Sequence, residues 1–308
     1  MRSFDILQPS LPDHIILICL LVIGFSSICM GQTRSKIIAN NATLQQVIST
    51  CKFTEGPAVD RYGNVYFTDQ PNDRIMRWSN DGSVSVYMEN TGRSNGLYFD
   101  HDGFLIACAD ENNELWKIDE KKKVTVLLDK MEGKRFNGPN DLWIDNDGGI
   151  YFTDPFYKRE YWSHTEPELD HRDVYYLSPD HSQVRMVASD FVQPNGIVGT
   201  PDGKKLYVAD IGDKKTYGFQ IDEDGGLSDR TLFVEMGSDG MTLDNKGNLY
   251  ITGDGVTVFN NGGEQIEHIK IDERWTANVC FGGKKQKTLF VTAMGSLYTL
   301  DMKVKGVR

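Results

Sequence analysis

The sequence is poor in cysteine and has none of the paired spacings that bind metals or crosslink small folds. Its five cysteines include no CxxC pair, so neither a zinc site nor a disulfide framework is indicated. Positive charge is also scarce, because 33 Lys and Arg face 44 Asp and Glu, which leaves a net charge of −11. A chain with this charge repels a phosphate backbone, and nucleic acid is therefore excluded as an expected partner.

Common catalytic signatures are missing as well. The chain contains no GxSxG nucleophile elbow, no Walker loop and no dinucleotide-binding glycine pattern. No window shows a sustained 3.6-residue apolar stripe with caps, so we expect little helix. These absences argue against the hydrolase, nucleotide-binding and dehydrogenase classes that carry those motifs.

Only one long apolar run occurs, "IILICLLVIGFSSICM" at residues 15–30. It is short for a bilayer span and fits the apolar region of a secretory signal with cleavage near Gly31. We therefore expect a signal peptide at 1–31, a linker at 32–42 and one folded domain at 43–303. A secreted or periplasmic location without stable membrane insertion follows, and a retained membrane anchor is the alternative.

A stretch like "EGPAVDRYGNVYFTD" recurs six times along the chain. The copies share a short apolar strand, a turn rich in Asp, Asn and Gly, and a second strand, and they begin at Glu55, Asn95, Asn140, Asn195, Asp239 and Ala277. Turns of the Asp-Gly and Asn-Gly type tolerate positive φ and are hairpin signals. A third strand and often a fourth follow each copy.

A repeat of about 40 residues built from four strands is typical of a β-propeller. The sequence thus predicts an all-β fold, a six-bladed propeller with four-stranded antiparallel blades around a central channel. A β-sandwich with the same number of strands is the alternative. The last copy supplies only three strands, so we expect residues 43–50, "TLQQVIST", to close the ring from the N-terminal side.

The first residues of the copies should meet at one end of the channel, because the first strand of each blade lines it. Four of them offer oxygen donors, namely Glu55, Asn140, Asn195 and Asp239. Hard cations prefer such ligands, so we predict one divalent cation, Ca²⁺ first and Zn²⁺, Mg²⁺ or Mn²⁺ as alternatives. Without a cation the two carboxylates would repel and raise each other's pKa. The competing interpretation is that these residues are ordinary turn residues.

Neighbouring positions are less clearly defined by the pattern. Asn95 is ambiguous and could face the substrate, whereas Ala277 adds no ligand and leaves one side open. Either residue of the Asn140–Asp141 pair could face the channel. Alignment with Asn195 favours Asn140, and Asp141 would then orient the ligands.

The third repeat is longer than the others because it contains an aromatic segment, "PFYKREYWSHTEPELDHRD", at residues 155–173. Long loops in compact folds tend to be functional, so we expect this one to cover the metal end of the channel. Tyr157 and His164 are then candidate substrate contacts. The alternative is that the loop only packs on a neighbouring blade.

Several motifs resemble the gluconolactonase/regucalcin-like family of six-bladed propellers. They are "EGPAV" at 55, "FNGPNDLWID" at 136, "GIYFTDPFY" at 149, "QPNGI" at 193 and "SDGMTLDNKGNLY" at 238. The resemblance implies lactone hydrolysis, a metal at Glu55, Asn195 and Asp239, and proton transfer by Asp239. It makes Asn140 a ligand or substrate contact. An arginine that closely precedes this asparagine in the regucalcin-like branch is not matched, since Arg135 lies five residues away.

The predicted function is a metal-dependent hydrolase that opens lactone rings, with a sugar lactone as the small-molecule substrate. A cation would polarise the carbonyl and a carboxylate would accept a proton from water. The same metal could instead serve phosphotriester or aryl-ester hydrolysis, and a non-catalytic propeller with a structural metal is a third possibility.

Overall fold

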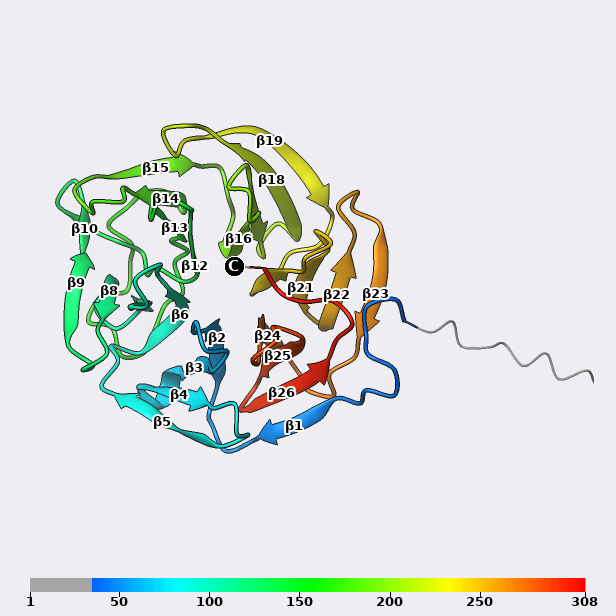
Figure 1. Ribbon diagram of the computed structural model, residues 1–308. Helices are drawn as coiled ribbons and strands as arrows, with labels where there is room; N and C mark the ends of the chain where they lie inside the picture. Colours follow the sequence, from blue (N-terminus) through cyan, green and yellow to red (C-terminus); the bar gives the residue numbers. More distant parts are fainter. Residues whose placement is uncertain (1–34, 308) are drawn as a thin grey trace, which may run out of the picture. The chain divides into compact units, whose positions relative to one another are not determined.

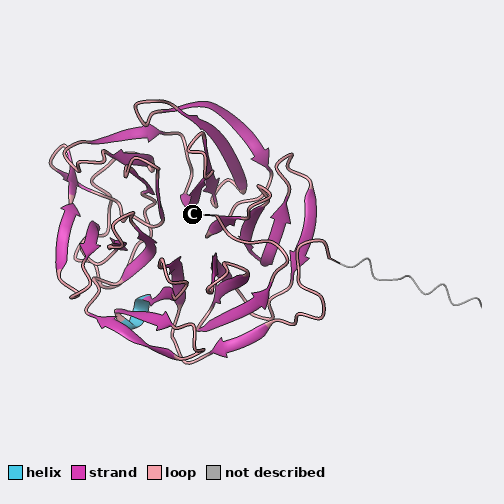
Figure 2. Cartoon of the chain, in the orientation of Figure 1, coloured by secondary structure: helices cyan, strands magenta, loops and turns pink. Residues whose placement is uncertain are grey.

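A computed structural model describes residues 35–307, which form a ring of six sheets (Figure 1). Each sheet contains four antiparallel strands, so the predicted all-β, six-bladed propeller is confirmed. Apart from a short 3-10 turn at Gln70–Asn72, the described chain is built from strands and loops (Figure 2).

The first three blades hold twelve strands in sequence order. They are β2 (Thr54–Val59), β3 (Val65–Asp69), β4 (Arg74–Trp78) and β5 (Val84–Glu89) in blade one; β6 (Ser94–Phe99), β7 (Leu105–Ala109), β8 (Glu114–Ile118) and β9 (Val124–Leu128) in blade two; β12 (Leu142–Ile144), β13 (Ile150–Thr153), β14 (Val174–Leu177) and β15 (Val184–Ala188) in blade three. A small hairpin, β10 (Lys130–Met131) with β11 (Lys134–Arg135), precedes blade three.

The next two blades follow the same order. They are β16 (Pro194–Gly199), β17 (Lys205–Asp210), β18 (Lys215–Ile221) and β19 (Leu227–Val234) in blade four; β20 (Met241–Leu243), β21 (Leu249–Gly253), β22 (Gly255–Phe259) and β23 (Gln265–Ile269) in blade five.

Blade six is completed by a strand from the other end of the described chain. Its own repeat supplies β24 (Thr276–Gly282), β25 (Thr288–Ala293) and β26 (Ser296–Asp301), and β1 (Gln45–Ile48) pairs antiparallel with β26. The Gln46 amide nitrogen lies 3.1 Å from the Tyr298 hydroxyl. The predicted closing strand is thereby confirmed. Ile38, in the segment expected to be a linker, also bridges to Met302 of this blade.

Asp-rich turns explain why the innermost hairpins of four blades form. In blade one the Asp60 carboxylate accepts hydrogen bonds from the backbone N–H groups of Tyr62 and Asn64, at 2.8 and 2.9 Å. Gly63 has a φ of +90°, where a side chain would be strained. The same Asp-to-amide bonds recur at Asp100, Asp145 and Asp244. Each turn thereby sets the register of the strand that lines the channel.

Threonines at the ends of the second strands join neighbouring blades. The hydroxyls of Thr68, Thr153 and Thr252 donate to the backbone carbonyls of Asn95, Asn195 and Ala277, at 3.2, 2.8 and 2.7 Å. Each acceptor is the first residue of the next repeat. These buried hydrogen bonds fix the level along the channel axis at which the first residues of the repeats lie.

Apolar side chains pack between adjacent blades and form the core. Tyr151, Tyr250, Phe67, Phe152 and Phe290 are among the largest side chains that are fully buried. Because the core is divided among the blade interfaces, every blade depends on its two neighbours for burial.

The predicted signal peptide at 1–31 lies outside the described residues. Within residues 35–307 no helix has the length and apolar character needed to cross a membrane.

Candidate active site

Three of the four predicted ligands lie together at one end of the channel. The Asn195 side-chain amide donates to Asp239 Oδ1 at 2.9 Å, which links blade four to the loop that precedes β20. The Glu55 carboxyl group, from β2, lies within hydrogen-bonding reach of Asp239. The structure thus brings together residues that are up to 184 positions apart in the sequence.

Burial strongly disfavours charge on the two carboxyl groups. Glu55 is only 2 % exposed, and burial followed by the nearby charge of Asp239 raises its pKa well above the ordinary value. Burial also raises the pKa of Asp239, to about 6, against the opposing hydrogen bonds from Trp275 and Asn195. A cation between the two groups would remove this cost.

Asn195 provides an independent indication of a cation. Both N–H groups of its amide are used, since the nitrogen lies 2.7 Å from the Tyr157 hydroxyl and 2.9 Å from Asp239 Oδ1. Its amide oxygen is buried and has no hydrogen-bond partner among the described residues. A buried polar atom of this kind requires a partner. The oxygen, with the two carboxylates, fits a hard divalent cation.

This donor set differs from a cluster of charged ligands. The described residues contain no group of three or more His, Cys, Asp or Glu that could hold a metal. The candidate site has two carboxylates, and its remaining donor is an amide oxygen. Calcium accepts such neutral oxygen ligands, whereas zinc favours His and Cys.

Asn140 and Asn95 are placed at the same level mainly through their backbones. The Asn140 carbonyl accepts from Gly96 N–H at 2.8 Å, and the Asn95 carbonyl accepts from the Thr68 hydroxyl. Within residues 35–307, no hydrogen bond links either side chain to Glu55 or Asp239. Their assigned roles, ligand and substrate contact, stay predictions.

A second layer of side chains crosses the channel one residue further along the repeats. Four repeats have glycine there, whereas the third has Asp141 and the sixth has Asn278. The Asn278 amide lies 3.5 Å from Asp141 Oδ2 and also interacts with Glu55. A Cβ atom on Gly240 would lie 1.9 Å from Asn278 Cγ, so the glycines make room for this pair. Burial raises the pKa of Asp141 to about 7.

Blade six contributes to the site although its first residue does not. Ala277 has no ligand atom in its side chain, but Trp275 Nε1 donates to Asp239 Oδ2 at 2.6 Å. The sequence pattern missed Trp275 and Asn278 because both lie beside the aligned position. The departure from glycine at Asn278 was the available signal.

The aromatic loop, residues 155–173, reaches the site through Tyr157. The Tyr157 hydroxyl accepts from the Asn195 amide, as described above. His164 instead stacks on Trp162, with ring centroids 4.7 Å apart and planes at 14°. Trp162 donates to the Asp110 carbonyl of blade two at 2.7 Å. The loop therefore both contacts the cluster of predicted ligands and packs on a neighbouring blade.

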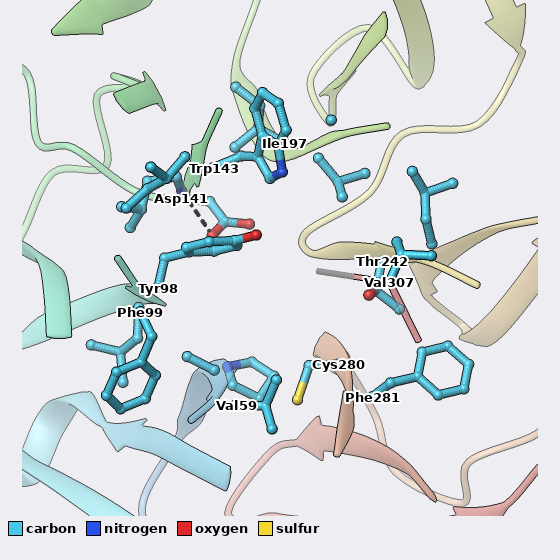
Figure 3. Close-up of a pocket in the computed structure, with 18 of the residues that line it drawn as sticks. Val59, Tyr98, Phe99, Asp141, Trp143, Ile197, Thr242, Cys280, Phe281 and Val307 are labelled. Atoms are coloured by element: carbon cyan, nitrogen blue, oxygen red, sulfur yellow. Dashed lines mark hydrogen bonds between the residues drawn. The ribbon is translucent and has the colours of Figure 1, made fainter. Parts of the chain in front are cut away.

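A cavity of about 350 Å³ occupies the channel on the far side of Asp141 and Asn278. All six inner strands line it, and its walls include Tyr98, Trp143 and Phe281 (Figure 3). Val307, near the end of the chain, closes part of one side. None of the predicted ligands lines this cavity, so the cavity and the candidate chemistry lie at different levels of the channel.

The fold and the oxygen-donor cluster together define a six-bladed propeller with a candidate metal site at one end of its channel. A family model described as SMP-30/Gluconolactonase/LRE-like region matches residues 53–295. The chain belongs to this family.

Relatives in this family support the same assignment. The chain is 28 % identical over 300 residues to a gluconolactonase of Zymomonas mobilis, covering 88 % of this chain and 84 % of that protein. A solved gluconolactonase structure from Xanthomonas campestris is 31 % identical, with a TM-score of 0.81 over 86 % of this chain and 91 % of that one. The calcium-binding protein regucalcin of Agrobacterium tumefaciens shares the fold at 19 % identity, with a TM-score of 0.72 over 86 % and 95 % of the two chains.

Proposed function

We propose that this protein is a divalent-metal-dependent lactonase that opens sugar lactones, with Ca²⁺ as its cation. The carrying observation is the buried Asn195 amide oxygen, which has no hydrogen-bond partner in the described chain and lies in the cluster of Glu55 and Asp239. Relatives named gluconolactonase support the substrate class.

Glu55, Asn195 and Asp239 would hold the cation, with Asn140 as a further ligand or a contact to the substrate. A bound divalent cation would supply polarisation of the lactone carbonyl. The attraction of Glu55 and Asp239 to the shared positive charge would offset the repulsion between them. The cation would therefore stabilise the site in addition to polarising the substrate.

Asp239 is placed to move a proton. Trp275 and Asn195 hold its two oxygens, so the carboxylate cannot rotate freely. It would take a proton from the attacking water and return it to the ring oxygen when the ester bond breaks, which yields a hydroxy acid. Burial raises the pKa of Asp239 to about 6 in the metal-free fold, and a bound cation would lower it again. Within residues 35–307 the Tyr157 hydroxyl only accepts a hydrogen bond, so its proton could be donated toward the substrate.

Export by the segment at 1–31 remains part of the proposal. A secreted or periplasmic location is supported by the apolar run at 15–30 alone. Detection of the mature N-terminus in exported protein would test it, and an intact N-terminus in the membrane fraction would favour an anchor.

The function is tested by hydrolysis of glucono-1,5-lactone before and after metal removal. Chelation should abolish turnover and Ca²⁺ should restore it. Asp239→Asn should lower kcat about 100-fold or more, the usual scale for a general acid–base. Asp102→Asn, in an exposed turn, is the matched control and should leave turnover unchanged.

A substrate panel separates the competing functions. Faster turnover of phosphotriesters or aryl esters than of any lactone would replace the proposed substrate class. Stabilisation by metal without turnover of any ester would indicate a binding propeller. Undiminished lactone hydrolysis after complete chelation would refute the metal-dependent mechanism.

A further inference from the structure

Four repeats have an aspartate at the end of their second strand, and one of these aspartates binds a different partner from the other three. In blades one, three and four the aspartate that follows "FT" or "VA" caps the segment leading into the same blade. Asp69, Asp154 and Asp210 each accept from two backbone N–H groups of that segment. The corresponding residue of blade two is Asp110, and its side chain points to another partner.

Asp110 binds the aromatic loop of blade three. Its Oδ2 accepts from Arg159 Nε at 2.8 Å and from the Tyr161 hydroxyl, and Gln70 Nε2 lies 3.3 Å away. Its backbone carbonyl accepts from Trp162. Asp110 is 3 % exposed, so this contact anchors the loop in the protein interior.

The anchored arginine faces the candidate active site. The Arg159 guanidinium carbon lies 5.4 Å from the centre of the Tyr157 ring, and the Tyr157 hydroxyl contacts Asn195. Its charge is close enough to lower the pKa of Asp239. Asp110 uses only Nε, and the terminal nitrogens form no hydrogen bond within residues 35–307. The arginine side chain is 23 % exposed.

The segment just before Asn140 does not supply such a positive charge to the site. Arg135 pairs with Glu168 at 2.8 Å and does not enter the cluster. At Gly138, two residues before Asn140, an added Cβ would lie 2.9 Å from Asp110 Oδ1 and 3.1 Å from Trp162. A side chain at this position would therefore displace the loop that carries Arg159.

We propose that Arg159 is a specificity-determining residue that donates its terminal N–H groups to the hydroxyl oxygens of a polyhydroxylated lactone. Asp110 positions it by holding Nε. The inference rests on the proposed lactonase function and narrows the substrate class, because an unsubstituted aliphatic lactone offers no hydroxyl oxygens to this group. A guanidinium fork held at one nitrogen keeps its remaining donors in a fixed direction.

The test compares glucono-1,5-lactone with δ-valerolactone in the wild type, Arg159→Gln and Arg159→Lys. For the sugar lactone, Arg159→Gln should raise KM about 10- to 100-fold with a smaller change in kcat, the scale of hydrogen bonds to a charged group. Arg159→Lys should recover part of this loss. The loss of kcat/KM should be at least tenfold greater for gluconolactone than for δ-valerolactone. Arg135→Gln is the control and should leave kcat/KM unchanged for both lactones.

Asp110→Asn tests the positioning role, and it should shift KM for gluconolactone in the same direction as Arg159→Gln. Equal losses on both lactones would overturn the inference, because they would show a general effect on Asp239 or on folding. If δ-valerolactone is not a substrate, a loss in kcat with unchanged KM for gluconolactone overturns it. If the wild type hydrolyses no lactone, the proposed function itself fails. Thermal unfolding curves identify any variant that does not fold.

Discussion

Asp239 is held on both carboxylate oxygens by nitrogen donors from different blades. Asn195 of blade four reaches Oδ1, and Trp275, just before β24, reaches Oδ2. Hydrogen bonds to the ionised form lower a carboxyl pKa, so these donors oppose the effect of burial. The orientation and the proton affinity of Asp239 therefore depend on two residues that cannot themselves transfer protons in the reaction.

Trp275→Phe should make Asp239 a weaker acid. Removing the indole N–H leaves Oδ2 without its donor, and the pKa of Asp239 should rise by about one unit, the scale of one hydrogen bond to a charged group. The acid limb of the kcat/KM profile for lactone hydrolysis should then move to higher pH. An acid limb that stays in place while kcat falls would show that Trp275 acts only through packing. Trp78→Phe, distant in blade one, is the control.

For single residues, the sequence predicts where a side chain lies in the fold better than which side chains it contacts. Glu55, Asn195 and Asp239 could be placed together because the repeat brings equivalent positions to one end of the channel. Trp275 and Arg159 could not, because one lies before its repeat and the other in a loop outside the repeat. Their contacts depend on side-chain directions that no periodic pattern encodes.

Hydrogen bonds at the strand ends fix the position of each blade relative to the next. Thr153 ends β13, and its hydroxyl donates to the Asn195 carbonyl at 2.8 Å while lying 3.2 Å from the Asp141 N–H. It thus connects Asn195, the predicted ligand of blade four, to the layer of side chains formed by Asp141 and Asn278. Hairpin turns and the "FTD" motif were both readable in the sequence, but the bond between blades appears only when the ring is built.

Thr153→Val should loosen this connection. Valine has a similar shape but leaves a buried carbonyl and a buried N–H without their partner, which costs about 2 kcal/mol of unfolding free energy. Urea unfolding should show this loss, and calcium titration should show weaker binding because Asn195 is less firmly placed.

Thr231→Val provides the matched control for this prediction. Thr231 also donates to a backbone carbonyl, that of Gly218, at 3.3 Å, but it lies on the exposed outer strand β19. Its replacement should change stability by less than about 0.5 kcal/mol. Equal losses for the two variants would contradict a special role for Thr153.

Closure of the ring is a property of the whole molecule. Blade six joins β26 to β1, so its four strands come from segments about 250 residues apart. The sequence predicted this closure from the missing fourth strand of the last repeat. It did not predict that Ile37 would be buried against the same blade, because an isolated pair of apolar residues carries no repeat signal.

Removal of residues 1–49 should therefore open the ring. The chain would lose β1 and the buried Ile37, which exposes the edge of β26 and costs at least about 3 kcal/mol. Unfolding by urea should shift to a lower midpoint, and the protein should associate through the free edge. A chain that lacks only residues 1–34 is the control. Identical midpoints for the two chains would show that closure contributes little.

Three carboxyl groups with raised pKa lie in one short length of the channel: Glu55, Asp141 and Asp239. In the unfolded chain they ionise near pH 4, whereas in the metal-free fold Asp239 and Asp141 hold their protons to about pH 6 and 7. Over this interval the native state binds more protons than the unfolded state. The free energy of unfolding must then fall as pH rises.

We expect chelated protein to lose on the order of 2 kcal/mol of stability between pH 4.5 and 7.5, because each unit of pKa shift contributes about 1.4 kcal/mol before relaxation. Ca²⁺ should offset most of the loss at the upper end of this range and little at the lower end, where protons compete with it. Asp141→Asn should flatten the metal-free decline, whereas Asp102→Asn should not. Urea unfolding at each pH measures the stability of the chelated protein, of the calcium-loaded protein and of the two variants. A metal-free stability that rises through this interval would mean that burial does not disfavour the charged form of these carboxyl groups. The unpartnered amide oxygen of Asn195 would then be the one remaining indication of a cation among the described residues.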